Sequence, residues 1–415
     1  MSLENLMKSV ASDLQLSDED AFFLIENMIN CIGREQFTKR LLIENLTDEQ
    51  ILVIINYMEH EKIITTEVSY ECPVFNESSE TIPSANKCEF CEGNLMGDID
   101  HEVEFIYHLK DNAYKDVLKW LKEKEEERYF KHEFLDNLKR LKEASNRIIP
   151  FIGAGLSLPF GIPNWRGLIE RLSPSFEKNY QNEMFDDLMD SGDFMEALEL
   201  IKDKSYLITG EKQLQTKVVE IIKNTQLSYV EEREHNYSDI VKLESNFYLT
   251  TNYDLILSKY LSKFNEYTSA MNFNEFDDSQ ELHIGSNQVL HLHGNIKQKE
   301  SMVVSKKSYE KFYSDNDNNF RFVSLIGSKP LLFLGFSFND AFFEDLYNKI
   351  YNVISGNHYI VVANPNFDTA RELAKKNLKV IGLNIKKNKN DGTDSQDYVK
   401  ALKVLIRYLT NDNGT

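Results

Sequence analysis

The chain has 415 residues, which is long enough for two or three folding units. Hydrophobic residues make up 41% of it and charged residues 27%, so the composition excludes a chain that is disordered throughout. No apolar run approaches the roughly 20 residues that cross a bilayer, and the first residues lack the pattern of a secretory signal. We therefore expect a cytoplasmic protein with no membrane partner.

The formal net charge of −20 is concentrated at one end of the chain. Residues 1–100 hold 20 acidic and 6 basic side chains, a net charge of −14, which leaves only −6 for the remaining residues. An acidic surface repels a phosphate backbone, because nucleic-acid binding depends on Lys and Arg displacing counterions. Nucleic acid is therefore not an expected partner of the N-terminal region.

The first part of the chain is predicted to form a small α+β domain over residues 1–110. Amphipathic patterns indicate two helices, at residues 18–30 and 47–60. Thr47 and Gln50 have the spacing of a capping box at the start of the second helix. Residues 62–72 are β-branched and roughly alternating, which is typical of a strand or hairpin arm. Helices followed by a β-wing predict a winged-helix-like domain, and its acidity favours a regulatory or protein-interaction role.

Three of the four cysteines are close together in the sequence. Cys88-Glu-Phe-Cys91 is a complete C-x-x-C pair, and Cys72-Pro-Val-Phe75 resembles half of a zinc knuckle whose second cysteine has become phenylalanine. Four cysteines in a chain of this length are too few for a disulfide framework.

A closed structural zinc site needs four ligands. Cys72, Cys88 and Cys91 supply three, and the candidates for the fourth are His101 and His108. Two alternatives stay open: a structural zinc site, or a degenerate zinc ribbon that has lost its metal. The fourth cysteine, Cys31, falls in a predicted helix and is expected to be part of the core.

Residues 111–145 are charged and helical in pattern, and they predict a solvated connecting helix. From residue 146 onward, short apolar runs alternate with helical patterns. Such runs are typical of strands buried on both faces of a parallel sheet. They lie at residues 147–152, 247–250, 289–293, 330–334, 358–363 and 379–384.

Residues 146–415 are therefore expected to form one α/β domain. Residues 166–245 lack strand signals and predict a helical insertion. The predicted fold class is α/β, with a Rossmann-like doubly wound parallel sheet and a helical insertion, preceded by the small α+β winged-helix-like N-terminal domain. Doubly wound sheets bind ligands at the carboxyl ends of their strands, so site residues should follow directly after each apolar run.

The first of these runs ends in Gly153-Ala-Gly-Leu-Ser157. Two glycines one residue apart let the backbone turn sharply and approach a pyrophosphate, although a tight turn without a ligand fits this motif equally well. The longer run Gly153-Ala-Gly-Leu-Ser-Leu-Pro-Phe-Gly-Ile-Pro-Asn-Trp-Arg166 resembles the sirtuin signature. That signature runs Gly-Ala-Gly-Ile-Ser, three variable residues, Gly-Ile-Pro, one residue, an aromatic residue and Arg, with the same spacing.

Four further strand ends resemble sirtuin motifs in the same order. They are Thr250-Thr-Asn-Tyr-Asp254, similar to Thr-Gln-Asn-Ile-Asp; His291-Leu-His-Gly294, similar to the family's His-Gly; Gly335-Phe-Ser337, similar to Gly-Thr-Ser; and Asn364, where sirtuins place an asparagine against the adenosine ribose. Within the family, the chain looks most like the bacterial sirtuin-like NAD-cleaving effectors of antiphage defence. Trp165 in place of the usual Phe and the run Leu332-Phe-Leu-Gly-Phe-Ser-Phe-Asn-Asp340 favour that branch.

The resemblance implies roles for particular residues. His293 would accept a proton from a ribose hydroxyl or a water, and Asn252 would orient the ribose or the attacking water. Asp254 would anchor the nicotinamide carboxamide. The implied cofactor-binding residues are Gly153, Ala154, Gly155, Ser157, Trp165, Arg166, Asp254, Gly335, Ser337 and Asn364. Trp165 would flank the nicotinamide pocket, and Ser157 and Ser337 would bind phosphate or ribose oxygens. His291 is expected to be a packed neighbour.

The resemblance implies an NAD+ hydrolase that releases nicotinamide and ADP-ribose and depletes NAD+ in abortive infection. It also implies a homo-oligomer, with a regulatory protein partner or a phage trigger acting through the N-terminal domain. Deacylating sirtuins bind zinc through two Cys pairs between the His-Gly and Gly-x-Ser motifs, and no cysteine lies between His293 and Gly335. A protein deacylase or ADP-ribosyl transferase is therefore disfavoured. A non-catalytic module that senses NAD or a related nucleotide stays open as the alternative.

Overall fold

The computed structural model describes residues 3–32, 36–43, 46–82, 86–95, 97, 101–110, 113–173, 176, 178–205, 208–263, 270–275, 288–327, 329–336, 341–354, 356–388 and 392–410. The chain divides into two compact units, Met1–Glu126 and Glu127–Gly414. Among the described helices, none has the length and apolar character needed to cross a membrane.

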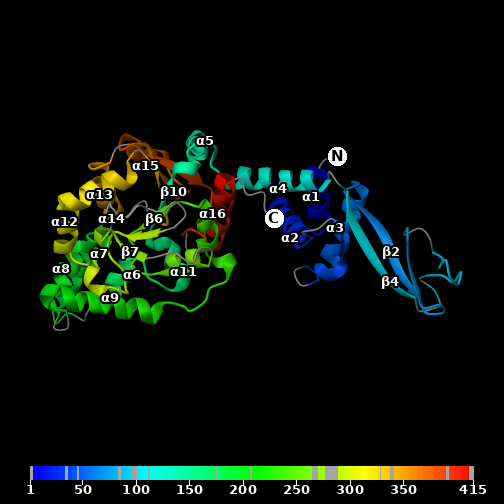
Figure 1. The fold of residues 1–415 in the computed structure, drawn as a ribbon, viewed down its shortest axis with the longest axis horizontal. Helices are drawn as coiled ribbons and strands as arrows, with labels where there is room; N and C mark the ends of the chain where they lie inside the picture. The colour runs from blue at the N-terminus through cyan, green and yellow to red at the C-terminus, as the bar shows by residue number, and fades with distance from the viewer. Residues whose placement is uncertain are drawn as a thin grey trace. The chain divides into compact units, whose positions relative to one another are not determined.

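The N-terminal unit combines helices with a four-stranded antiparallel sheet (Figure 1). The helices are α1 (Leu3–Asp13), α2 (Asp18–Ile32), the short η1 (Lys39–Leu41), α3 (Asp48–His60) and α4 (Ala113–Tyr129), which ends just beyond the unit. The strands are β1 (Gln36–Thr38), β2 (Ile64–Cys72), β3 (Glu77–Thr81) and β4 (Glu102–Leu109), in the order β1-β4-β2-β3.

Local sequence accounts for much of this unit. The predicted capping box forms: the Gln50 amide donates to Thr47 Oγ1 at 3.3 Å, and the Thr47 amide donates to Gln50 Oε1 at 3.0 Å. α1 was not predicted, although it buries Leu6 and Val10 in the same core as α2 and α3. The winged-helix assignment and the domain boundaries stay predictions.

The C-terminal unit is built on a seven-stranded sheet in the order β11-β10-β9-β5-β6-β8-β7. Its strands are β5 (Ile149–Ile152), β6 (Phe247–Thr250), β7 (Ala270–Asn272), β8 (Gln288–His291), β9 (Leu331–Leu334), β10 (His358–Ala363) and β11 (Leu378–Leu383). All neighbouring pairs are parallel, which confirms the predicted fold class. Six strands match the predicted apolar runs, while the three-residue edge strand β7 lacks such a run and was missed.

Helices lie on both sides of this sheet (Figure 1). They are α5 (Leu135–Glu143), α6 (Trp165–Leu172), α7 (Asn179–Ser191), α8 (Phe194–Lys204), α9 (Glu211–Thr225), α10 (Tyr237–Ile240), α11 (Ile256–Ser262), α12 (Lys306–Ser314), α13 (Asn316–Ile326), α14 (Ala341–Tyr351), α15 (Phe367–Lys375) and α16 (Ser395–Thr410). Short 3-10 turns are η2 (His132–Phe134), η3 (Ser145–Arg147), η4 (Ala154–Phe160), η5 (Glu232–Glu234), η6 (Val241–Leu243), η7 (Phe273–Glu275) and η8 (Lys299–Ser301). The predicted insertion corresponds to α6–α10, and its described residues form no strand.

Residues 111–145 differ from the single connecting helix that was expected. They form α4, η2 and α5, with a break at Phe130 and Lys131. The break has a physical reason, because Phe130 pairs with Leu383 at the edge of the sheet and the Lys131 amide donates to the Gly382 carbonyl at 3.0 Å. These sheet contacts are incompatible with continued helical hydrogen bonding.

Candidate functional site

The predicted site residues share one edge of the parallel sheet. The carboxyl ends of neighbouring strands lie at the same height in the sheet, because their last residues pair: Ile152 with Leu334, Ile152 with Thr250, and Thr250 with His291. The residues that follow these ends are, in order across the sheet, Asn364, Gly335, Gly153, Asn252 and His293. Neighbouring strands are about 4.8 Å apart, so this row extends over about 19 Å. Such a length suits an extended dinucleotide better than a mononucleotide.

The chain reverses direction across the sheet between β5 and β9. From β5 it continues through β6 to β8 on one side, and it then returns to β9, β10 and β11 on the other. This is the topological switch point, where open α/β sheets form a crevice beyond their strand ends. Gly153 and Gly335 are the first residues past the two strands that border it.

The glycines at the switch point are required by the close approach of two loops. A Cβ atom on either Gly153 or Gly155 would lie 2.7 Å from the Gly335 carbonyl oxygen. Gly335 itself has φ = 73°, a left-handed conformation that favours glycine. The Gly153 and Gly155 amides donate to the carbonyls of Leu334 and Gly335 at 2.8 and 2.9 Å, so both are used between the two loops.

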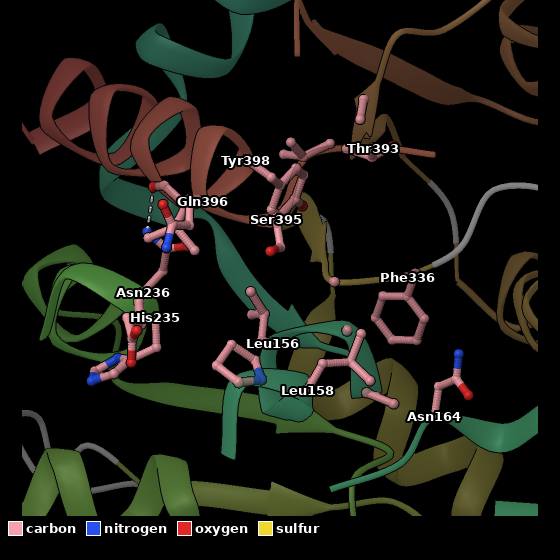
Figure 2. Close-up of a pocket in the computed structure, with 18 of the residues that line it drawn as sticks. Leu156, Leu158, Asn164, His235, Asn236, Phe336, Thr393, Ser395, Gln396 and Tyr398 are labelled. Atoms are coloured by element: carbon pink, nitrogen blue, oxygen red, sulfur yellow. Dashed lines mark hydrogen bonds between the residues drawn. The ribbon is translucent and has the colours of Figure 1, made fainter. Parts of the chain in front are cut away.

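A cavity of about 730 Å³ opens at the same place, within the usual size range of ligand pockets. Figure 2 shows Leu156 and Leu158 of η4 facing Ser395 and Tyr398 of α16 across it. Of the predicted cofactor-binding residues, those that line it are Ala154, Gly155, Trp165 and Gly335.

Two segments that line this cavity were not predicted. One is Thr393 with the start of α16, which contributes Ser395 and Tyr398. The other is residues 234–236, where Asn236 donates to the Val399 carbonyl at 2.8 Å. Both segments reach the cavity through tertiary packing of α16, and no local motif in the sequence marks them. Asn236 and Glu234 were read only as part of the helical insertion.

Asn252 belongs to a buried polar network beside the cavity. Its Nδ2 donates to the Gly153 carbonyl and to Ser157 Oγ, both at 3.1 Å. Ser157 Oγ in turn donates to Asp254 Oδ2 at 2.8 Å and lies 2.7 Å from the Tyr237 hydroxyl. Burial raises the pKa of the Asp254 carboxyl. Asn252 Oδ1 is buried and has no hydrogen-bond partner among the described residues, so it is an acceptor available to a substrate or a water.

His293 follows β8 and is completely buried. Its Nε2 lies 2.8 Å from the Tyr313 hydroxyl, and the rings of Tyr309, Phe312 and Tyr313 of α12 have centroids 5.6–5.9 Å from the imidazole. Burial lowers the pKa of His293 to about 3, so the imidazole is neutral at physiological pH. His293 lines neither the large cavity nor the small one beside Asn252.

His291 behaves as the packed neighbour that the sequence indicated. Its Nδ1 lies 2.8 Å from the Asn252 carbonyl oxygen, and it is 1% exposed. Burial lowers the pKa of His291 to about 4. The contact ties the loop after β6 to the end of β8, two residues before His293.

Of the other predicted cofactor-binding residues, some line a cavity and others do not. Trp165 lines both the large cavity and the small cavity beside Asn252, where Ser157 and Asp254 also lie. Arg166 points elsewhere, with its guanidinium on the Met189 carbonyl and near Glu170 at 3.6 Å. Ser337 lies outside the described residues.

The Asn364 side chain, just after β10, hydrogen-bonds the backbone just after β11. Its Nδ2 donates to the Ile385 carbonyl at 2.7 Å, and its Oδ1 accepts from the Ile385 amide at 3.0 Å. Its φ of 48° is in the left-handed region, where asparagine is favoured over most residues. Each polar atom keeps one further hydrogen-bonding position, the second Nδ2 hydrogen and the second Oδ1 lone pair, for a contact with a ribose.

The predicted metal ligands lie in the N-terminal unit. The ligand atoms of Cys72, Cys88, Cys91 and His101 are all within 4.8 Å of one another. His108, the other candidate, instead has its Nε2 3.1 Å from Glu67 Oε2 on β2. Cys31 packs partly buried against the helical core, as expected.

Comparison with known proteins agrees with this geometry. Residues 246–381 match a family described as the SIR2-like domain. The chain is 27% identical over 247 residues to the NAD(+) hydrolase ThsA of Cytobacillus dafuensis, covering 58% of this chain and 45% of the relative. It is 27% identical over 229 residues to NAD(+) hydrolase ThsA of Acinetobacter baumannii, covering 53% of this chain and 43% of the relative.

A third protein of the same name, from Bacillus cereus, is 23% identical over 219 residues. The chain thus spans less than half the length of the curated relatives it matches. The resemblance indicated by the strand-end motifs is confirmed to the extent that residues 246–381 match the SIR2-like domain.

Proposed function

We propose that the C-terminal unit hydrolyses NAD+ to nicotinamide and ADP-ribose. The observation that carries this proposal is the register of β6 and β8, in which Asn252 and His293 each follow the paired Thr250 and His291 by two residues. The names of the three relatives support the same reaction.

The reaction breaks the bond between the nicotinamide nitrogen and ribose C1′, and the bonding electrons leave with nicotinamide. The resulting oxocarbenium-like centre is attacked by water, and one proton is released. In the buried state the pKa of His293 is about 3, so the imidazole is neutral but weakly basic. Its pKa must rise on activation before His293 can accept that proton efficiently. Asn252 Oδ1, which lacks a partner among the described residues, can accept a hydrogen bond from the ribose or the water.

The ADP part of the substrate is assigned to the cavity at the switch point. Glu234 is the one charged side chain among the described residues that line it, and none of them is Lys or Arg. A 2′-phosphate would add up to two negative charges without a lining cation to balance them. We therefore expect NAD+ to be preferred over NADP+ by at least about tenfold in kcat/KM, and equal values would contradict this part of the proposal.

The test of the reaction is product analysis by chromatography with NAD+ and the purified full-length chain. His293→Ala and Asn252→Ala should each lower the rate of nicotinamide release by about 10²–10⁴-fold. His132→Ala, at an exposed position on η2, is the matched control and should leave the rate unchanged. Equal rates for wild type and both site variants would reject the assignment.

A second candidate function is sensing of NAD+ or a related nucleotide without turnover. It is favoured by the complete burial of His293 and by its absence from the linings of both cavities. Calorimetry separates the two functions: micromolar binding of NAD+ with no nicotinamide release at any protein concentration would favour sensing. A protein deacylase is disfavoured by the lack of cysteines between His293 and Gly335.

We further propose that the protein acts in the cytoplasm as an antiphage effector and is controlled by homo-oligomerisation, with the N-terminal unit receiving a protein partner or phage trigger. The burial of His293 supports the need for control, because the imidazole must become accessible before it can act. Light scattering and NAD+ turnover measured over the same range of protein concentrations test the assembly. Full turnover by a monomer would contradict this control.

A further inference from the structure

The strongest feature outside the nucleotide site is the cysteine cluster at the tip of the β2–β4 ladder. The backbone pairing of these antiparallel strands ends with Glu71 opposite Glu102. The next residue on β2 is Cys72, and the residue before β4 is His101, so the register itself brings these two side chains together. His108 pairs with Thr65, six residues further along the ladder. Six residues of strand are about 20 Å, so His108 cannot reach the cluster.

The spacing of the ligand atoms fits a tetrahedral metal ion. Cys91 Sγ and His101 Nε2 are 3.4 Å apart, and the ligand atoms of Cys72, Cys88, Cys91 and His101 lie within 4.8 Å of one another. Bond lengths of about 2.3 Å to sulfur and about 2.0 Å to nitrogen place neighbouring ligands of a tetrahedral zinc about 3.5–3.8 Å apart. Three thiolates and one imidazole complete the coordination, which is the pattern of a structural site.

The three cysteines lie in two turns that share the same hydrogen bond, from the amide of the fifth residue to the carbonyl of the first. The Asn76 amide donates to the Cys72 carbonyl at 2.7 Å, and the Glu92 amide donates to the Cys88 carbonyl at 2.9 Å. Asn76 and Glu92 both adopt left-handed backbone angles, with φ of 56° and 58°. The second turn has Cys91 at its fourth position.

The first turn has Phe75 at the equivalent position, and that side chain is 57% exposed. His101 therefore takes the place of the ligand that the first turn lacks. This repetition explains why one turn supplies a single ligand and why the fourth must come from the neighbouring strand.

The tip has little else to hold it together. The 34 residues from Tyr70 to Val103 bury a core of four side chains among the described residues, and two of these are Cys72 and Cys88. Segments with so small a core depend on a metal or on disulfides for stability. The Tyr70 ring packs 6.1 Å from that of His101, and its hydroxyl accepts from the Glu89 amide at 3.1 Å, so the surrounding groups orient the ligands.

We propose that Cys72, Cys88, Cys91 and His101 bind one structural Zn²⁺ that closes the tip of the β2–β4 ladder. The site is independent of the proposed hydrolysis, because all four ligands belong to the Met1–Glu126 unit. With four protein ligands and no open position, the ion stabilises structure and does not activate water.

The experiment measures zinc per chain by elemental analysis on the full-length protein, purified without chelator and then equilibrated with zinc and desalted. Wild type should hold about one zinc per chain. Cys88→Ser and His101→Ala should hold less than about one fifth of that. The matched controls Cys31→Ser and His108→Ala should keep the wild-type value. His101→Cys should also keep about one zinc, because a thiolate replaces the imidazole.

Cobalt(II) substitution supplies a second readout that does not depend on activity. Co²⁺ in the wild type should give the visible absorption of a tetrahedral thiolate site, and His101→Cys should change that spectrum while keeping the metal. Circular dichroism of each variant identifies any that fail to fold. Zinc below about 0.1 per chain in folded wild type, or loss of zinc from His108→Ala with retention in His101→Ala, would overturn the proposal. A disulfide between two of the cysteines, detected by mass spectrometry in place of metal, would also overturn it.

Discussion

The strand ends of the C-terminal sheet and the tip of the N-terminal ladder hold their functional groups in position by different means. At the sheet edge, five loops are aligned by strands whose residues are buried throughout, such as Phe247–Thr250 and Leu331–Leu334. At the tip, two turns and one strand bring four ligand atoms together over a core of four buried side chains. The first arrangement depends on packing, and the second would depend on coordination of the proposed metal ion. Substitutions that change core volume should therefore affect the C-terminal sheet, and changes in metal content should affect the tip of the ladder.

The largest expected effect on the packing side comes from Phe333→Ala. Phe333 is fully buried on β9, with its ring centroid 4.9 Å from that of Phe151. Its truncation should lower the free energy of unfolding of the C-terminal unit by about 3–5 kcal/mol, because it leaves a cavity in the core. Denaturant unfolding followed by tryptophan fluorescence and far-UV circular dichroism measures the loss. Zinc content should be unchanged, and the exposed Phe75→Ala should shift stability by no more than about 0.5 kcal/mol.

Gly335→Ala should have the next largest effect. A Cβ at Gly335 would lie 2.7 Å from Leu156 Cγ and 2.9 Å from the Leu156 amide nitrogen, and φ is 73°. The strained backbone and the collision together should cost about 2–3 kcal/mol and separate the two loops at the switch point. NAD+ binding measured by calorimetry should weaken more than tenfold. Gly327→Ala is a useful control, since Gly327 also has positive φ (52°) but an added Cβ would lie 3.9 Å from the Val323 carbonyl oxygen, without a collision. Equal binding losses in both variants would contradict the role of the loop contact.

Acid should destabilise the C-terminal unit through its buried histidines. Burial lowers the pKa of His291 to about 4 and that of His293 to about 3, below the ordinary value of about 6.5. Between pH 6.5 and about 4, the unfolded chain binds protons that the folded chain does not. Each histidine then removes about 1.4 kcal/mol of stability per pH unit as the pH falls.

The raised pKa of Asp254 acts in the opposite direction and reduces the net loss. Scanning calorimetry at pH 7, 6 and 5 measures the slope. His291→Gln removes one titrating group and should flatten it, and an unchanged slope in that variant would contradict the assignment.

The smallest expected effect on stability comes from Tyr313→Phe, which removes the hydroxyl 2.8 Å from His293 Nε2. Loss of this hydrogen bond should cost about 1 kcal/mol. As a positioning residue, Tyr313 should affect kcat more than KM, with a several-fold change in the rate of nicotinamide release. Tyr229→Phe, at a side chain 73% exposed, should change neither quantity. A change in KM alone would indicate that Tyr313 contacts substrate instead of orienting the imidazole.

The parallel sheet was accessible from the sequence because each central strand is an uninterrupted apolar run. The edge strand β7 was not, since Ala270–Asn272 is short and partly exposed. The grouping of the site residues at one end of the sheet also followed from the sequence, because each motif directly follows a strand. Their order across the sheet did not, because it depends on how the strands pair.

What the sequence could not supply was the orientation of side chains. Asn364 has the expected residue type at the expected strand end, yet both polar atoms of its side chain bond to Ile385. The α16 residues that line the cavity could not be predicted either, because they reach it only through the packing of that helix against the strand ends. Conversely, the choice of His101 over His108 follows from strand register, which sequence spacing alone leaves undetermined.

The ligand contributed by His101 instead of residue 75 changes what a bound metal would do mechanically. A cysteine at position 75 would bind within the first turn and leave the ends of β2 and β4 joined only by their backbone pairing. With His101 as ligand, the ion would join Cys72 and His101, which lie next to the last backbone pair of β2 and β4, Glu71 and Glu102. Separation of β2 from β4 at the tip would then require release of a metal ligand, so the lifetime of coordination would limit the rate at which the tip opens.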